Sequence, residues 1–400
     1  MLGIKTAALP GSLRRTNQRT VISLLLRLGA ASRADLAKAA GISQPTAGKI
    51  TTELLKLGIL QEAGPSGNGD QAGTPRLGRP GQLLRLDTRR ARFLTIELGV
   101  SETNVSALPV ALEMHDEWAF TFPTPRSPEA WLKQLKAVSG GLSGAHFWGV
   151  LISVPGIVDE AAGKVLFSPN LHWLEKVHLP RLVGKLWPLP VLLVQEIRAL
   201  ALGHLSAGPG GEDFFLVDFG EGVGGAIVLG GKLYSHPKPL SGEFGHTPVP
   251  GNHRRCGCGA VGCLETLVSE RGLLESYQGA SGRSARAGGW KALAQHVNER
   301  GLEPWLSDSL DATAKVISGA LNVLGIHQVI VTGRLTELHG CVRRLGTLIQ
   351  KGAMWGRFGE VICQSAPHRR AAGLVGVGID RLILPADGDK SLILKQSQKA

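Results

Sequence analysis

The chain has 400 residues, which is too many for one compact core, so its length predicts two or three domains. Hydrophobic residues make up 43% of it and charged residues 19%, as is ordinary for a globular protein. No stretch approaches the roughly 18 apolar residues of a membrane-spanning helix, and no export signal is recognisable. Three of the five cysteines lie between Cys256 and Cys263, unlike a secreted disulfide framework. We therefore expect a cytoplasmic protein without membrane partners.

Positive charge is concentrated near the N-terminus. Residues 1–92 contain 15 basic and 5 acidic side chains, a net charge of +10, whereas the whole chain carries +12. A basic end on a nearly neutral body is typical of a module that binds a polyanion such as nucleic acid. A mitochondrial transit peptide is the alternative, but the acidic residues and the patterned apolar positions of this segment argue against it.

The first ninety residues carry the pattern of three helices and a wing. Residues 16–28 place apolar side chains on one helical face, and Ser32 precedes a short helix that Gly41 ends. Ser43 then caps a third helix that ends at Gly58. Two helices joined by so tight a turn form a helix-turn-helix, and the segments that follow can form two short strands joined by a basic loop. We predict a winged helix-turn-helix over residues 1–90.

In such a fold the exposed face near the start of the third helix enters the major groove of DNA. Glutamine can read adenine there and lysine can reach guanine or phosphate, and the candidates are Gln44, Thr46 and Lys49. Arginines around the wing suit phosphate or minor-groove contacts, and they are Arg76, Arg79 and Arg85. The predicted partner is double-stranded operator DNA. A three-helix module that binds protein is the alternative.

From Ala91 onward, strand-like apolar runs alternate with helical stretches and glycine-rich loops. Strand patterns include residues 92–100 and 147–158, and helical patterns include 197–205 and 312–325. This alternation predicts an α/β body with partly parallel sheets. Two of the glycine-rich turns follow strands and could bind phosphate, although such turns alone are a weak signal.

One histidine and three cysteines lie within eighteen residues, with the spacing H-x9-C-x-C-x4-C. They are His246, Cys256, Cys258 and Cys263. This set suits a closed tetrahedral zinc site, in which thiolates and an imidazole hold the ion and fix a long loop. We predict one structural zinc ion per chain. The alternative is three incidental cysteines in a glycine-rich loop. Cys341 and Cys363 stand apart from the motif and are predicted to be packing residues.

These motifs resemble the ROK family, which comprises repressors, open reading frames and sugar kinases. The matching stretches are ISVPGIVD at 152–159, SPNLHW at 168–173, GEFGH at 242–246 and CGCGAVGCLE at 256–265. The resemblance implies a winged helix-turn-helix followed by a two-lobed actin-like (ribonuclease H-like) sugar-kinase fold, with a sugar in the cleft. It also implies a homodimer or homotetramer.

The resemblance sets the predicted domain boundaries and site residues. The DNA-binding domain covers 1–90 and the first lobe covers 91–200, completed by a C-terminal helix near 371–383. The second lobe, with the zinc loop, covers 201–370. The zinc ligands match the four motif residues above, and the positions that approach a sugar match Gly156, Asn170, Glu196, Glu243, His246 and Glu265. Carboxylates suit this role because they accept two hydrogen bonds from vicinal diols. For Glu243 the alternative is a carboxylate that fixes the zinc loop.

The chain departs from the kinase pattern at three places. Active kinases of the family carry an Asn-Asp pair where this chain has Gln195-Glu196, so Glu196 occupies the general-base position with its carboxylate displaced. The two phosphate loops carry Glu102 and Glu221. Unless both side chains point into solvent, they repel a triphosphate. The resemblance and these departures predict no catalytic residue and no bound ATP.

The prediction is therefore a sugar-responsive DNA-binding repressor that is not an enzyme, with a monosaccharide or sugar phosphate as effector. One alternative is a DNA-binding protein that retains ATP-dependent sugar kinase activity. Another is a repressor controlled by a protein partner, such as a sugar-transport component.

Overall fold

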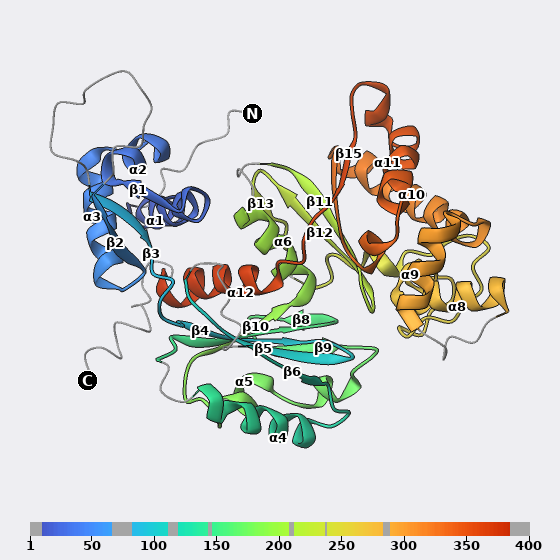
Figure 1. The fold of residues 1–400 in the computed structure, drawn as a ribbon, viewed down its shortest axis with the longest axis horizontal. Helices are drawn as coiled ribbons and strands as arrows, with labels where there is room; N and C mark the ends of the chain where they lie inside the picture. The colour runs from blue at the N-terminus through green and yellow to red at the C-terminus, as the bar shows by residue number, and fades with distance from the viewer. Residues whose placement is uncertain are drawn as a thin grey trace. The chain divides into compact units, whose positions relative to one another are not determined.

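The computed structural model describes residues 10–65, 82–110, 119–142, 146–207, 212–236, 238–282 and 289–384 (Figure 1). These residues fall into two compact units, each built from separated stretches of the chain. The first takes the described residues up to Ser153 together with Leu179–Leu193 and those from Leu374 onward. The second takes Val154–His178 and Val194–Gly373. The predicted DNA contacts Arg76 and Arg79 lie outside the described residues.

The first unit begins with three helices and a small antiparallel sheet, an arrangement that fits a winged helix-turn-helix. The elements are α1 (Pro10–Leu28), β1 (Ala30–Ser32), α2 (Arg33–Ala40), α3 (Gln44–Lys56), β2 (Leu60–Pro65) and β3 (Gln82–Leu86). The sheet order is β1-β3-β2, with Ala31 opposite Leu84 and Gln61 opposite Arg85. Helix α1 starts at Pro10, earlier than the predicted Thr16, and proline suits the first helical position because its φ is already fixed.

Local sequence explains where the next two helices begin and end. The Ser32 Oγ accepts a hydrogen bond from the backbone N–H of Asp35 at 3.2 Å, and the Ser43 Oγ accepts one from that of Thr46 at 3.4 Å. Gly41 ends α2 with a φ of 64°, a left-handed conformation that favours glycine. The two serine caps and the glycine stop are therefore confirmed.

A five-stranded sheet follows, in the order β10-β7-β4-β5-β6. Its strands are β4 (Phe93–Leu98), β5 (Glu102–Leu108), β6 (Ala119–Pro123), β7 (Gly149–Val154) and β10 (Val191–Gln195). Helices α4 (Pro128–Ser139) and α5 (Leu179–Val183) lie on one side of it, and the 3-10 turn η2 covers Gly140–Leu142 (Figure 1). The other side receives the C-terminal helix α12 (Arg370–Gly378) and its π-helical extension η7 (Ile379–Ile383), where Gly378 approaches Phe93 and Leu151.

The second unit contains another five-stranded sheet, in the order β13-β12-β11-β14-β15. Its strands are β11 (Phe214–Phe219), β12 (Val223–Leu229), β13 (Lys232–Leu233), β14 (Gln328–Gly333) and β15 (Ile362–Ser365). The helices are α6 (Glu196–Ala207), α7 (Glu265–Val268), α8 (Glu270–Ser281), α9 (Gly289–Arg300), α10 (Pro304–Leu324) and α11 (Cys341–Gly352). The unit also holds the hairpin of β8 (Ile157–Asp159) and β9 (Lys164–Phe167) and the 3-10 turns η3 (His172–Lys176), η4 (Phe244–His246), η5 (Arg334–Glu337) and η6 (Met354–Arg357).

The two large sheets repeat one topology. In each sheet the first strand pairs antiparallel with the second and parallel with the fourth, and the third strand pairs antiparallel with the second. In the second unit, α6 packs on one face of the sheet through Ile197 and Leu200. The larger core lies on the other face and includes the buried Cys341, with Cys363 packed against it. Both of these cysteines are packing residues, as predicted.

Within the second unit, α6 and the start of α12 (up to Gly373) approach each other with their backbones in contact, because glycine lies at both crossing points. A Cβ atom on Gly203 would lie 1.9 Å from the carbonyl oxygen of Arg369, and one on Gly373 would lie 1.8 Å from that of Ala199. A side chain at either position would separate the helices. This crossing brings Arg370, at the start of α12, against the start of α6.

Across the described segments, no helix has the length and apolar character that crossing a membrane requires.

Candidate metal and sugar site

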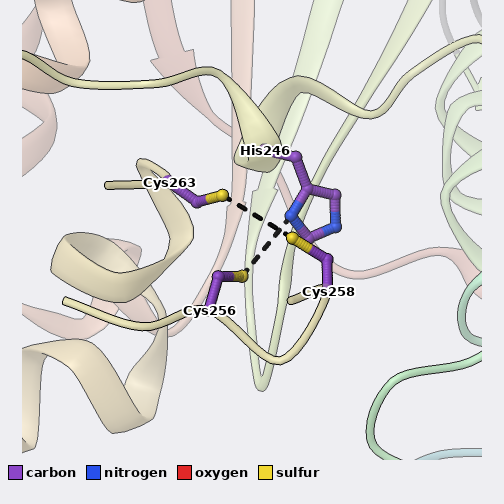
Figure 2. Close-up of side chains that lie close together, drawn as sticks. All are labelled: His246, Cys256, Cys258 and Cys263. Atoms are coloured by element: carbon purple, nitrogen blue, oxygen red, sulfur yellow. Dashed lines mark hydrogen bonds between the residues drawn. The ribbon is translucent and has the colours of Figure 1, made fainter. Parts of the chain in front are cut away.

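The four residues of the predicted zinc motif converge in the second unit (Figure 2). The Cys256 Sγ lies 3.6 Å from the His246 Nδ1, and the Cys258 Sγ lies 3.7 Å from the Cys263 Sγ. One ligand atom from each residue lies within 4.8 Å of all the others. All three cysteines are free thiols, so the cluster is not closed by a disulfide.

Tight turns in the cysteine loop make this convergence possible. His246 ends the 3-10 turn η4, and the loop returns through isolated bridges between Pro248 and Cys263 and between Arg255 and Val261. Gly262 has a φ of 89°, and a Cβ there would lie 2.8 Å from the carbonyl oxygen of Asn252. The loop therefore requires glycine at this position.

The donor set and its spacing fit a tetrahedral metal ion. Two thiolates held about 2.3 Å from one tetrahedral ion lie about 3.8 Å apart, close to the observed sulfur separation. Burial raises the pKa of the Cys256 and Cys263 thiols, which keeps them protonated. A coordinated cation would reverse this effect, because it binds the thiolate. The cluster could thus hold a metal ion through all four residues.

Two carboxylates border the metal cluster. The Glu243 Oε2 lies 3.8 Å from the His246 Nε2, the ring nitrogen that does not face Cys256, and the Glu243 Oε1 accepts a hydrogen bond from the Gln195 amide at 3.4 Å. The Glu265 Oε2 accepts from the backbone N–H of Val223 at 3.0 Å, and its Oε1 lies 3.6 Å from the Cys256 Sγ. Burial raises the pKa of Glu243. Both carboxylates are therefore fixed beside the cysteine loop.

The remaining sugar-site candidates lie in the same unit. Asn170 is exposed, and its Oδ1 would lie 3.7 Å from a Cβ built on Gly257, so it lies against the cysteine loop. Gly156 has a φ of 95°, and a Cβ there would lie 2.2 Å from the carbonyl oxygen of Phe167. Glycine at this position lets the loop after β7 pass close to β9. Glu196 directly follows Gln195, which contacts Glu243.

Glu196 has neighbours that sequence reasoning missed. Its carboxylate forms an ion pair with Arg370, and ligand atoms of Glu196, Asp218 and His368 lie within 4.8 Å of one another. The Asp218 Oδ1 accepts a hydrogen bond from the Thr332 hydroxyl at 2.7 Å. An acid in the apolar strand FFLVDF just before a glycine loop is a signal that could have identified Asp218. No local signal marks His368 or Arg370.

Burial has opposite effects on the acids and the imidazole of this group. It raises the pKa of Glu196 and of Asp218, since a carboxylate loses solvation there. Although His368 is exposed as a whole residue, loss of solvation around its ring lowers its pKa to about 4, with a smaller contribution from Arg370. The imidazole is therefore neutral near pH 7, and its Nε2 accepts a hydrogen bond from the Arg370 Nη2 at 3.3 Å.

The two glycine-rich loops differ from a loop whose backbone N–H groups are free to bind phosphate. In the loop after β11, the N–H of Gly220 binds the carbonyl oxygen of Gly222 at 3.0 Å, and the N–H of Val223 binds Glu265. Two backbone donors are thus already used. In the first unit, Glu102 is exposed at the start of β5, and the Asn104 amide lies 3.5 Å from its Oε1.

The predicted DNA contacts lie on the outer side of α3. Gln44 and Lys49 are exposed and Thr46 is half-buried, whereas the opposite face of the helix is buried through Ala47, Ile50 and Leu54. Arg85 is exposed on β3. The described candidates therefore stand where they can reach a ligand.

Comparison with known sequences identifies relatives among repressors and kinases. The model of the ROK family matches residues 93–379. A putative xylose repressor of Caldicellulosiruptor sp. (strain Rt8B.4) is 32% identical over 272 residues, which are 66% of this chain and 66% of that protein. The chain thus matches just under two thirds of the repressor's length. An N-acetylmannosamine kinase of Escherichia coli O157:H7 is 29% identical over 294 residues, 72% of this chain and 97% of the kinase.

Solved structures show the same fold. A ROK family transcriptional regulator, a homolog of the E. coli MLC protein, superposes with a TM-score of 0.69 at 20% identity, covering 92% of this chain and 96% of that chain. A ROK glucokinase from Streptomyces griseus, in complex with glucose and AMPPNP, gives a TM-score of 0.59 at 24% identity, over 71% of this chain and 97% of the kinase. The predicted fold class, an N-terminal helical region ahead of an actin-like sugar-kinase fold, is confirmed. The chain belongs to the ROK family.

Proposed function

We propose that this chain is a sugar-responsive, DNA-binding transcriptional repressor that senses its effector without phosphorylating it. The observation that carries the proposal is the arrangement of α1–α3 and their small antiparallel sheet ahead of the region that matches the ROK family, residues 93–379. The N-acetylmannosamine kinase matches 72% of this chain, whereas the structure of the ROK regulator covers 92% of it. The similarity to xylose repressors supports the same conclusion.

The DNA-binding part is residues 1–90, which carry most of the net positive charge. Gln44, Thr46 and Lys49 at the start of α3 would read base edges, and Arg76, Arg79 and Arg85 would contact phosphate or the minor groove. A homodimer or homotetramer would place two DNA-binding domains on an operator with two half-sites. The protein would act in the cytoplasm, where it can reach operator DNA.

The body comprises a first lobe over 91–200, with the helix near 371–383, and a second lobe over 201–370. In the second lobe one structural zinc ion, held by His246, Cys256, Cys258 and Cys263, would fix the loop that carries Glu243 and Glu265. Those carboxylates, with Glu196, Gly156, Asn170 and the second nitrogen of His246, would bind the hydroxyl groups of a sugar. Polar groups of this kind can hold a sugar in a fixed orientation.

The same unit is poorly equipped for phosphoryl transfer. A general base must accept the proton of the attacking hydroxyl, but the Glu196 carboxylate is paired with Arg370. The loop after β11 has two of its N–H groups engaged, and Glu221 adds a carboxylate to it. These features support a site that binds a sugar but does not bind ATP and does not catalyse phosphoryl transfer.

The test begins with selection of operator sequences from a randomised duplex library by the full-length protein. Fluorescence anisotropy then measures operator affinity with and without monosaccharides and their phosphates. We expect specific binding that at least one sugar changes several-fold. Incubation with Mg-ATP and the same sugars should give no product. Turnover of about 1 per second or faster would instead establish a DNA-binding kinase. A response only to lysate would point to control by a protein partner such as a sugar transporter.

A further inference from the structure

The ion pair between Glu196 and Arg370 lies mostly out of solvent. Its two side chains are 24% and 12% exposed. The Arg370 guanidinium also donates to the neutral imidazole of His368 at 3.3 Å. Backbone contact between α6 and α12 at Gly203 and Gly373 holds the pair together. The Arg370 Nη2 group is therefore shared between two partners within the protein.

The other charged groups around this pair are mainly acidic. Asp218 contributes a second buried carboxylate next to Glu196, and Glu243 is linked to the neighbouring Gln195. Arg198, in the first turn of α6, is itself paired with Glu160 at 3.0 Å. Arg370 and Arg198 are thus each paired with a carboxylate, and Asp218 and Glu243 add two more carboxyl groups.

We propose that this arrangement makes the site select an uncharged sugar over a phosphate ester of the same sugar. The inference rests on the proposed function, in which a sugar binds beside Glu196 and Glu243. A sugar hydroxyl can donate to the Glu196 carboxylate without displacing Arg370, because a carboxylate has about four acceptor sites. A phosphate, with a charge of about −1.5 to −2 near pH 7, would compete with Glu196 for the Arg370 Nη2 group, and drawing that group away would leave Glu196 beside Asp218 unpaired.

The electrostatics of the site support this selection. Burial already raises the pKa of Glu196 and Asp218, so negative charge is disfavoured beside the ion pair even before a ligand arrives. Like charges a few ångströms apart repel strongly where water is partly excluded. The negative charge of a bound phosphate would be disfavoured for the same reason.

Calorimetry with the full-length protein tests the proposal on matched pairs of ligands. The pairs are D-xylose with D-xylose 5-phosphate, D-glucose with D-glucose 6-phosphate, and N-acetylmannosamine with its 6-phosphate. For the sugar that binds, we expect the uncharged member to bind at least about 10-fold more tightly, equivalent to about 1.4 kcal/mol. Tighter binding of the phosphate ester would overturn the inference and leave the proposed sensor intact. No response to either member of any pair would overturn both.

Two variants locate the source of the selection. Glu196→Gln removes one negative charge and keeps an amide oxygen for Arg370, and Asp218→Asn keeps an acceptor for the Thr332 hydroxyl. Each substitution should raise the affinity for the phosphate ester several-fold. The ratio of the affinity for the uncharged sugar to that for its phosphate ester should therefore fall. Glu299→Gln is the matched control, because Glu299 is exposed on α9, where it accepts from Gln295 at 2.8 Å. The assignment to the ion pair is wrong if the Glu196 and Glu299 variants give the same ratio as the unmodified protein.

Discussion

Arg19 on α1 and Asp380 on η7 form an ion pair although they are 361 residues apart in the sequence. The carbonyl oxygen of Asp380 also accepts a hydrogen bond from the Arg15 guanidinium at 3.1 Å. The first helix of the DNA-binding region is thus attached to the C-terminal helical segment of the same unit. The π-helical turn at this point is a feature often found at functional sites.

A neighbouring face of α1 is attached to α3, the helix expected to read DNA. The Arg14 guanidinium lies 2.6 Å from both carboxylate oxygens of Glu53 on α3, and the Gln18 amide donates to Glu53 at 2.9 Å. Helix α12, which continues into η7, begins at Arg370, the partner of Glu196. A continuous helical segment therefore joins the residue that neutralises Glu196 to the residue that holds α1. We expect this segment to carry the sugar signal.

The first prediction concerns this attachment. Asp380→Asn removes the charge that holds Arg19, so the sugar should lose most of its effect on operator affinity, as measured by anisotropy. The free energy of unfolding should change by less than about 1 kcal/mol, because both partners are about 40% exposed. Asp308→Asn, at an exposed position on α10, is the control. An unchanged sugar response in the Asp380 variant would show that the signal takes another route.

The second prediction concerns the metal. Cys258→Ser should lose the zinc ion and lower the thermal midpoint, because a structural metal contributes its binding free energy to folding. Cys363→Ser should retain the ion, since Cys363 packs against the core away from the cluster. Elemental analysis gives the zinc content per chain, and a scan with and without chelator gives the stability. Unmodified protein that is fully folded and metal-free would contradict the assignment.

The third prediction separates base reading from phosphate contact. Lys49→Ala should change which operator sequences are preferred, with a loss of about 1–3 kcal/mol at the affected base pair. Arg85→Ala should weaken binding to all sequences alike and reduce the salt dependence by about one phosphate contact. Lys133→Ala is the control, because it removes one positive charge at an exposed position on α4, outside the predicted DNA-binding domain. If all three variants lose the same affinity, net charge alone explains binding.

The fourth prediction is a pH dependence of stability. Burial raises the pKa of Asp218 in the folded state above its value in the unfolded chain. The contribution of this carboxyl group to the free energy of unfolding is therefore greatest at low pH and is lost as the pH rises through the folded-state pKa. Asp218→Asn removes this loss while keeping an acceptor for Thr332. The variant should be more stable than the unmodified protein at pH 8, by an amount within the ~0.5–3 kcal/mol range of single substitutions. Denaturant unfolding from pH 8 to pH 5 should show the difference shrinking as the pH falls.

The sequence predicted those features that depend on neighbouring residues. Ser32 and Ser43 cap their helices because the acceptor and the N–H lie three residues apart, and the spacing of His246 and the cysteines predicted which four side chains converge. The partners of Glu196 could not be found in this way. Arg370 reaches it only because two glycines let α6 and α12 cross closely, and that contact depends on the tertiary fold. The same is true of Arg19 and Asp380.

The last prediction concerns nucleotide binding. Glu102→Lys combined with Glu221→Thr removes two carboxylates from the glycine-rich loops and adds one positive charge. Affinity for Mg-ATP should therefore rise, and titration with a fluorescent nucleotide measures it. Sugar phosphorylation should still be undetectable, because the Glu196 carboxylate remains paired with Arg370 and the N–H of Val223 remains bound to Glu265. Glu129→Lys with Glu299→Thr provides a control with the same charge change at exposed positions on α4 and α9. Equal nucleotide affinity in the two double variants would mean that the loop carboxylates do not exclude ATP. Turnover in the loop variant would mean that Glu196 can still act as a base despite its ion pair.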